Sequence, residues 1–158
     1  MYTELPNRDA IIEKLDQILQ HELAGVVRYT HYSFMIFGYS RIPVVGWFRS
    51  AANETLTHAT EAGEMITMLG GHPSLGIGSL LETHQHDMAA ILRESMDFEI
   101  AGVELYRELL TLAEQSGSVT LEEYARRLIS EEAVHISDID KMLRRPGDVE
   151  QAVNNETP

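Results

Sequence analysis

Apolar residues recur every three or four positions along most of this chain, which is the spacing of one face of an α-helix. The pattern is interrupted by segments rich in glycine, proline and serine, which disfavour helix. It predicts four helices, over about residues 7–37, 44–69, 81–115 and 121–143. Asn7 is the expected N-cap of the first helix, and Ser118 or Thr120 that of the fourth.

The connections between these helices predict how they are arranged. The first two helices have a short join, as do the last two, so each pair should be antiparallel. The segment that starts at Gly70 spans about a dozen residues and reaches roughly 40 Å at about 3.3 Å per residue, which is about the length of a 27-residue helix. The fold class is therefore all-α, a four-helix bundle that permits one long crossover between helices two and three. We expect one domain over residues 1–145 and a flexible polar tail over residues 146–158.

Polar side chains lie at or beside the inward-facing positions of all four helices. The apolar stripes, continued in steps of three and four residues, pass through Glu22, His58, Glu99, Glu132 and His135. On the second helix the inward position three residues before His58 is Thr55, and Glu54 stands beside it. A carboxylate inside a helical core costs several kcal/mol unless it has a partner. Because four helices carry such groups, a shared metal pair is the simplest partner.

The residue types in this set suit that interpretation. Carboxylates are hard oxygen donors that can bridge two cations, and imidazole suits iron, zinc or copper. A single Glu-x-x-His pattern occurs often by chance. Here, however, Glu22 precedes His58 by 36 residues and Glu99 precedes His135 by the same 36, which suggests two similar hairpins with matching donors. The donors predict a two-metal site but leave open iron, manganese and zinc.

The composition limits the classes of partner. The 158-residue chain has a formal net charge of −13, which argues against binding nucleic acid and is compatible with attracting cations. It has no cysteine, which excludes disulfides and cysteine-ligated iron–sulfur clusters. No apolar run reaches transmembrane length, and the N-terminal residues MYTELPNRDA lack the apolar segment of a secretory signal. We therefore expect a cytoplasmic protein with no membrane partner.

The stretches around the donors resemble those of the ferritin-like superfamily, and of bacterioferritins most closely. They are QHELAGVVRYTHY, THATEAGEMITMLGGHP, DFEIAGVELYREL and ISEEAVHISDIDKML, and the resemblance covers about residues 9–143. It implies a ferritin-like crossover, a homo-oligomer, and oxidation of Fe(II) by O2 or peroxide at a di-iron centre within each subunit, with Fe(III) stored as mineral. It also implies that Glu22, His58, Glu99, Glu132 and His135 are metal ligands, with two irons per subunit.

The resemblance departs from the family pattern on the second helix. The family's bridging glutamate lies three residues before its histidine, and that position is Thr55 here. Glu54 is the nearest substitute as sixth ligand, through a small helix rotation or a longer reach, and Glu61 is a weaker one. The family's haem-binding methionine directly follows that glutamate. Leu56 stands there instead, so haem bound in the family's manner is not expected.

Three alternatives remain open at the level of sequence. A non-catalytic member of the same fold would serve as a shell or interaction subunit with an impaired centre. A plain helical interaction module would pair its buried acids with Arg28, Arg93 or Lys141. A Dps-type site would use Glu64, but the aspartate expected one turn earlier is Thr60. A further group of histidines, which is more simply explained as solvated surface, comprises His72, His84 and His86.

Overall fold

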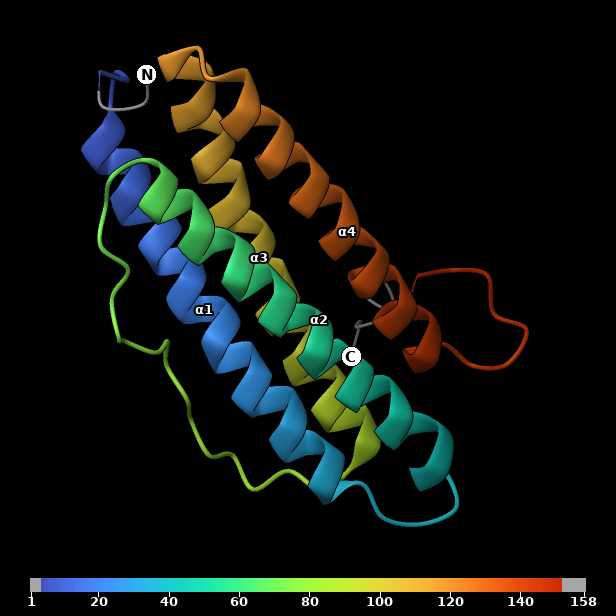
Figure 1. Cartoon of the computed structure of the whole chain (residues 1–158). Coiled ribbons are helices and arrows are strands. Elements are labelled where there is room, and N and C mark those ends of the chain that lie inside the picture. Colours follow the sequence, from blue (N-terminus) through green and yellow to red (C-terminus); the bar gives the residue numbers. More distant parts are fainter. Residues whose placement is uncertain (1–3, 152–158) are drawn as a thin grey trace.

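The computed structural model describes residues 4–151, and all regular secondary structure within this range is helical. Its four helices form a bundle (Figure 1), as the sequence predicted. They are α1 (Arg8–Met35), α2 (Arg41–Met68), α3 (Met88–Ser116) and α4 (Val119–Leu143). None of the helices in the described range is both long enough and apolar enough to cross a membrane.

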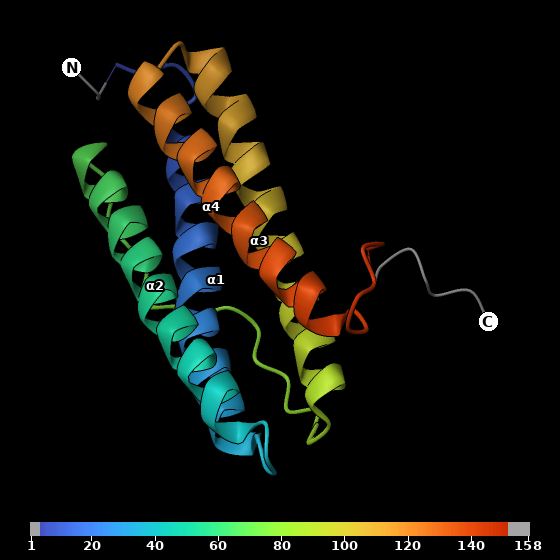
Figure 2. The ribbon, with the colours of Figure 1, turned by 90° about the vertical axis from the view of Figure 1, so that its right-hand side faces the viewer.

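The bundle consists of two helical hairpins that pack against each other. Helix α1 packs along α2, α3 packs along α4, and α1 also packs against α3 (Figures 1 and 2). The segment 69–87 joins the hairpins by running along the outside of α1. Two hydrogen bonds fix it there: the Gly78 amide donates to the Gln20 carbonyl at 2.8 Å, and the Ser74 amide donates to Asp16 Oδ1 at 2.8 Å. The predicted single long crossover is thereby confirmed.

The third helix begins at Met88, and the prediction that it begins near residue 81 was wrong. Asp87 is its N-cap, and the Asp87 side chain accepts a hydrogen bond from the Ala90 amide at 2.9 Å. Just before it, His84 has a positive φ of 54°, which a continuous helix does not accommodate. Leu81 is 76% exposed, so a helix at this position would not be stabilised by burial of that side chain. Helix α3 therefore begins seven residues later than its sequence suggested, and the crossover is correspondingly longer.

The N-caps of the other helices differ in how closely they match the prediction. Ser118 caps α4, and its hydroxyl accepts from the Leu121 amide at 3.4 Å. Asn7 does occupy the N-cap position of α1, but it is left-handed at φ 59° and its side chain makes no capping hydrogen bond. Asparagine tolerates that conformation better than most residues, so Asn7 serves α1 by its backbone geometry rather than by its amide.

The apolar core is divided into two parts by a polar layer. One part lies toward the start of α1 and includes Leu15, Leu109 and Leu128. The other lies toward the end of α1 and includes Phe48 and Ile91. Between them along the helices come the buried polar residues Glu22, Thr55, His58, Ser95, Glu99 and Glu132. The two apolar parts hold the helices at fixed separation and rotation on both sides of this layer, which positions its side chains.

Helix α1 approaches its neighbours closely beside the polar layer, at Gly25. A Cβ atom there would lie 2.7 Å from Thr55 Cγ2 and 2.8 Å from the Phe98 ring. We therefore expect Gly25→Ala to lower the free energy of unfolding by about 1–3 kcal/mol through overpacking. Gly63→Ala in α2 is the control: nothing lies within 4 Å of its Cβ position, and alanine in a helix interior should gain about 0.5–1 kcal/mol. Urea unfolding of both variants measures this, and equal stability of Gly25→Ala and wild type would contradict the packing described.

Candidate metal centre

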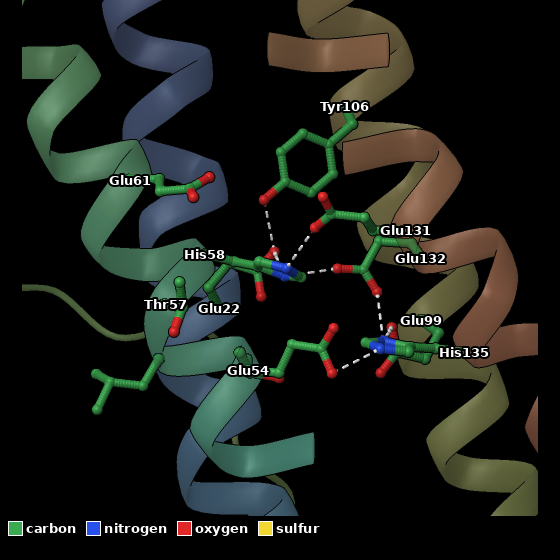
Figure 3. A network of polar contacts seen from close by, with 12 residues as sticks. Glu22, Glu54, Thr57, His58, Glu61, Glu99, Tyr106, Glu131, Glu132 and His135 are labelled. Atoms are coloured by element: carbon green, nitrogen blue, oxygen red, sulfur yellow. Dashed lines mark hydrogen bonds and ion pairs between the residues drawn. The ribbon is translucent and has the colours of Figure 1, made fainter. Parts of the chain in front are cut away.

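Five of the sequence-predicted donors meet in the polar layer between the four helices (Figure 3). Glu22 comes from α1, His58 from α2, Glu99 from α3, and Glu132 and His135 from α4. The first four are at most 5% exposed, and the His135 side chain is 15% exposed. Groups this polar are rarely buried together without partners, so their convergence is the main feature of the layer.

The five donors form two groups that share Glu132. One group is Glu22, His58 and Glu132, the other is Glu99, Glu132 and His135, and within each group one ligand atom per residue lies within 4.8 Å of the others. His58 Nδ1 is 2.8 Å from Glu132 Oε1, and His135 Nδ1 is 3.2 Å from Glu132 Oε2. Each carboxylate oxygen of Glu132 therefore faces a different histidine. This is the arrangement in which one carboxylate can bridge two cations.

Glu22 and Glu99 complete the two groups, each at the same distance from the histidine of its group. Glu22 Oε1 lies 3.9 Å from His58 Nδ1, and Glu99 Oε2 lies 3.9 Å from His135 Nδ1. Tyr106 donates a hydrogen bond to Glu22 Oε1 at 2.7 Å, and Tyr29 donates one to Glu99 Oε1. Each tyrosine lies on the hairpin opposite to its glutamate, so these bonds fix the terminal carboxylates across the interface between α1 and α3.

The second helix supplies no carboxylate to either group. Thr55 is buried, and its hydroxyl donates to the Ala51 carbonyl of its own helix at 2.8 Å. The Glu54 side chain is 45% exposed, and its Oε2 lies 2.9 Å from His135 Nε2, the ring nitrogen that faces away from Glu132. Glu61, the weaker candidate, forms an ion pair with Arg127 at 2.5 Å. The structure thus brings Glu54 to the centre's edge, beside His135, but outside both groups.

Glu131 is the neighbour that the sequence analysis missed. Its Oε2 lies 3.2 Å from His58 Nε2, and its Oε1 accepts from Arg127 at 2.9 Å. The residue is off the buried stripe of α4 and directly precedes the more conspicuous Glu132. The one available signal was its position four residues before His135, which is also how Glu54 stands relative to His58.

Burial and mutual contact shift the titration of the whole group. Burial raises the pKa of Glu22 to about 8, and burial together with Glu132 raises the pKa of Glu99 to about 8. Burial also opposes ionisation of Glu132, but hydrogen bonds with Glu99 and His135 and the nearby charge of His58 outweigh it and lower the pKa of Glu132 well below its ordinary value. One carboxylate therefore carries the negative charge while the other two hold protons.

The histidines are shifted toward the charged form. Burial tends to lower the pKa of His58, but contacts with Glu132 and Glu22 raise it to about 9. Hydrogen bonds with Glu132 and Glu99 raise the pKa of His135 to about 11. At neutral pH, without a cation, these shifts favour the protonated forms of both histidines, Glu22 and Glu99 and the ionised form of Glu132. A cation that binds there has to displace these protons.

The donor set fits a pair of divalent metal ions. It offers three carboxylates and two imidazoles, with one carboxylate shared. No contact to the buried His58 Nδ1 meets hydrogen-bond geometry, although Glu132 Oε1 is 2.8 Å away. That nitrogen therefore faces Glu132 and Glu22 without a well-formed hydrogen bond to either. The buried glutamates contact histidines and tyrosines, whereas Arg28 contacts Tyr32 and Lys141 contacts Asp138, which does not favour a centre held by basic residues.

Comparison with known proteins identifies relatives in sequence and in fold. The chain is 26% identical over 153 residues to a bacterioferritin of Desulfovibrio desulfuricans (strain ATCC 27774 / DSM 6949 / MB), covering 94% of this chain and 84% of that protein. Its fold matches a solved ferritin-like, diiron-carboxylate protein of Bacillus anthracis str. Ames with a TM-score of 0.83 at 22% identity, over 88% of this chain and 99% of that one.

Two solved bacterioferritins share the fold at similar distance. That of Desulfovibrio desulfuricans has a TM-score of 0.78 at 23% identity, over 87% of this chain and 80% of that one. That of Rhodobacter capsulatus has a TM-score of 0.76 at 20% identity, over 85% and 84%. The family model of the ferritin-like domain matches residues 12–146, which is most of the chain. The resemblance indicated by the motifs is thereby confirmed, and the chain belongs to the ferritin family of ferritin-like domains.

Proposed function

We propose that this protein binds iron between its four helices and oxidises Fe(II) there, with O2 or peroxide as the electron acceptor, for iron storage or detoxification. The observation that carries the proposal is the position of Glu132, whose two oxygens face two different histidines. Iron is preferred over manganese or zinc, which suit the same donors, because the relatives are bacterioferritins and a diiron-carboxylate protein.

The two donor groups define two adjacent positions for the substrate ions. One ion is held by Glu22, His58 Nδ1 and Glu132, and the other by Glu99, His135 Nδ1 and Glu132. Two Fe(II) ions carry four positive charges, which stabilise the three carboxylates in their ionised form once the protons have left. Each Fe(II) gives up one electron. A peroxide molecule accepts two electrons and two protons and yields two water molecules.

The residues of the chain fix ligand number and handle protons in this scheme. Tyr106 and Tyr29 hold the terminal carboxylates in place by hydrogen bonds to Glu22 and Glu99. The protons that these carboxyl groups and the histidines hold leave as Fe(II) arrives. Three donors per ion leave open positions for the oxidant, which is how a protein-bound metal centre admits a reactant.

The alternative function, a ferritin-like subunit that binds metal without oxidising it efficiently, is favoured by one observation. Thr55 occupies the family's bridging position, and its hydroxyl is engaged with Ala51. A centre with one bridging carboxylate neutralises less of the charge that develops as Fe(II) becomes Fe(III). Such a protein would bind the ions and oxidise them slowly.

Haem is not part of the proposal. The side chain at the family's methionine position is Leu56, which is 48% exposed and has no sulfur ligand to offer. Homo-oligomerisation and a cytoplasmic location stay predictions from the sequence and its resemblance.

Glu132→Gln tests the shared ligand. The amide keeps the size of the side chain but cannot act as an anionic bridge, so we expect the rate of Fe(II) oxidation to fall at least about tenfold and fewer than two ions to bind. Stopped-flow absorbance under air and metal analysis of the isolated protein measure the two effects. Glu123→Gln, on the same helix with a side chain 72% exposed, is the control. A wild-type rate no faster than that of protein-free Fe(II) would refute the ferroxidase proposal.

Thr55→Glu tests whether the missing bridge limits the rate. The new carboxylate would project from the buried stripe of α2 one turn before His58, so we expect Fe(II) oxidation to become faster by about tenfold. The same stopped-flow assay measures the rate, and circular dichroism shows whether the helices are retained. A rate unchanged from wild type, in a variant that still folds and binds two ions, would remove Thr55 from the account of the centre.

Proton release on metal binding tests the charge state of the centre. Glu22 and Glu99 with a pKa of about 8, His58 at about 9 and His135 at about 11 are all protonated at pH 7. Two Zn(II) ions, used as redox-inert substitutes, should therefore release about four protons. The apparent affinity should rise steeply as the pH is raised from 6 to 7.5. A pH indicator in weakly buffered solution measures the release, and binding without any release would show that the donors are already deprotonated.

A further inference from the structure

The centre has an internal two-fold pattern that extends beyond the five donors. Each residue of the first hairpin that lies in or beside the centre has a counterpart 77 positions later, and with one exception the two residues are of the same type. The pairs are Glu22 with Glu99, Tyr29 with Tyr106, Glu54 with Glu131, and His58 with His135. The exception is Thr55, whose counterpart is the shared ligand Glu132. By this correspondence Glu54 matches Glu131, and neither matches the bridging position.

Each of the two outer glutamates, Glu54 and Glu131, contacts the histidine of the other hairpin rather than the histidine of its own helix. Glu131, on α4, lies 3.2 Å from Nε2 of His58 on α2, and Glu54, on α2, lies 2.9 Å from Nε2 of His135 on α4. In both histidines the other nitrogen, Nδ1, faces Glu132. Figure 3 shows the two imidazoles in this arrangement, with Glu132 between them and Glu54 on the outer side of His135.

The outer carboxylates differ from the donors in their exposure. The side chains of Glu54 and Glu131 are 45% and 37% exposed, against at most 6% for the three glutamates of the donor groups. Glu131 is held in addition by Arg127, which also contacts Glu61 across the boundary between α2 and α4. These carboxylates thus form a solvent-side layer around the two histidines.

This placement has a chemical consequence for the rings. A neutral imidazole carries its proton on one nitrogen only, and the hydrogen bond made by that nitrogen decides which one remains free for a metal. A carboxylate that accepts from Nε2–H leaves Nδ1 unprotonated and fixes the ring plane. The Nδ1 atoms that face Glu132 are the ones that the proposed function needs as ligands.

We propose that Glu54 and Glu131 are positioning residues that orient His135 and His58 for metal binding through Nδ1, and that Glu54 does not serve as the sixth ligand. The inference rests on the proposed function, because it assigns these residues a role toward the same pair of ions. It replaces the sequence-based expectation that Glu54 substitutes for the bridging glutamate. The centre then has five protein donors, arranged around a single shared carboxylate.

Zn(II) titration of alanine and glutamine variants tests this inference without any turnover. Isothermal titration calorimetry gives the number of ions and their affinities, and ¹⁵N-histidine NMR identifies the coordinating nitrogen. In wild type we expect two ions, bound through Nδ1, with Nε2 still protonated. Glu54→Ala and Glu131→Ala should still bind two ions, with the affinity for the ion beside the affected histidine lowered about 10–100-fold. Glu54→Gln should restore most of that affinity, because its amide oxygen can accept from Nε2–H.

The controls separate this inference from the proposed function. Glu64→Ala removes an exposed carboxylate from the same helix and should bind like wild type. If Glu54 is a ligand, both Glu54→Ala and Glu54→Gln lose one ion, and the inference is overturned. Alanine variants that bind like wild type, or coordination through Nε2, overturn it as well. A wild-type protein that takes up no Zn(II) overturns the proposed function itself, and the inference with it.

Discussion

The burial of three carboxylates between two apolar parts of the core is the constraint on which the rest of this structure depends. Glu22, Glu99 and Glu132 lie where a four-helix bundle would otherwise place aliphatic side chains. Two histidines and two tyrosines surround them, so that each carboxylate has a partner within the bundle. The apolar clusters on both sides hold the helices against this unfavourable layer, and they thereby fix the geometry of the donors.

The same constraint links the stability of the fold to its chemistry. Without a cation, burial and the neighbouring Glu132 raise the pKa of Glu22 and Glu99, and contacts with the carboxylates raise the pKa of both histidines. Divalent ions replace the protons of these groups at the same positions. Protons in the metal-free fold and cations in a metal-loaded centre are therefore two ways of satisfying one set of buried charges.

The sequence predicted much of this arrangement because it depends on helical periodicity. Steps of three and four residues placed Glu22, Glu99 and Glu132 inside, and the stripes themselves gave four helices. The start of α3 was missed because it is set by the capping side chain of Asp87 and not by the apolar pattern. The partners of Glu54 and Glu131 were missed for a different reason. Each contacts a histidine on the other hairpin. Such a contact depends on the relative rotation of two helices, which the sequence pattern of one helix does not determine.

Anomalous diffraction at the iron edge, from crystals soaked anaerobically in Fe(II), tests the central claim most directly. The account predicts two peaks in the polar layer, one on each side of Glu132, each beside the Nδ1 atom of one histidine. Absence of any iron peak between the four helices, in crystals where the donors remain ordered, would contradict it.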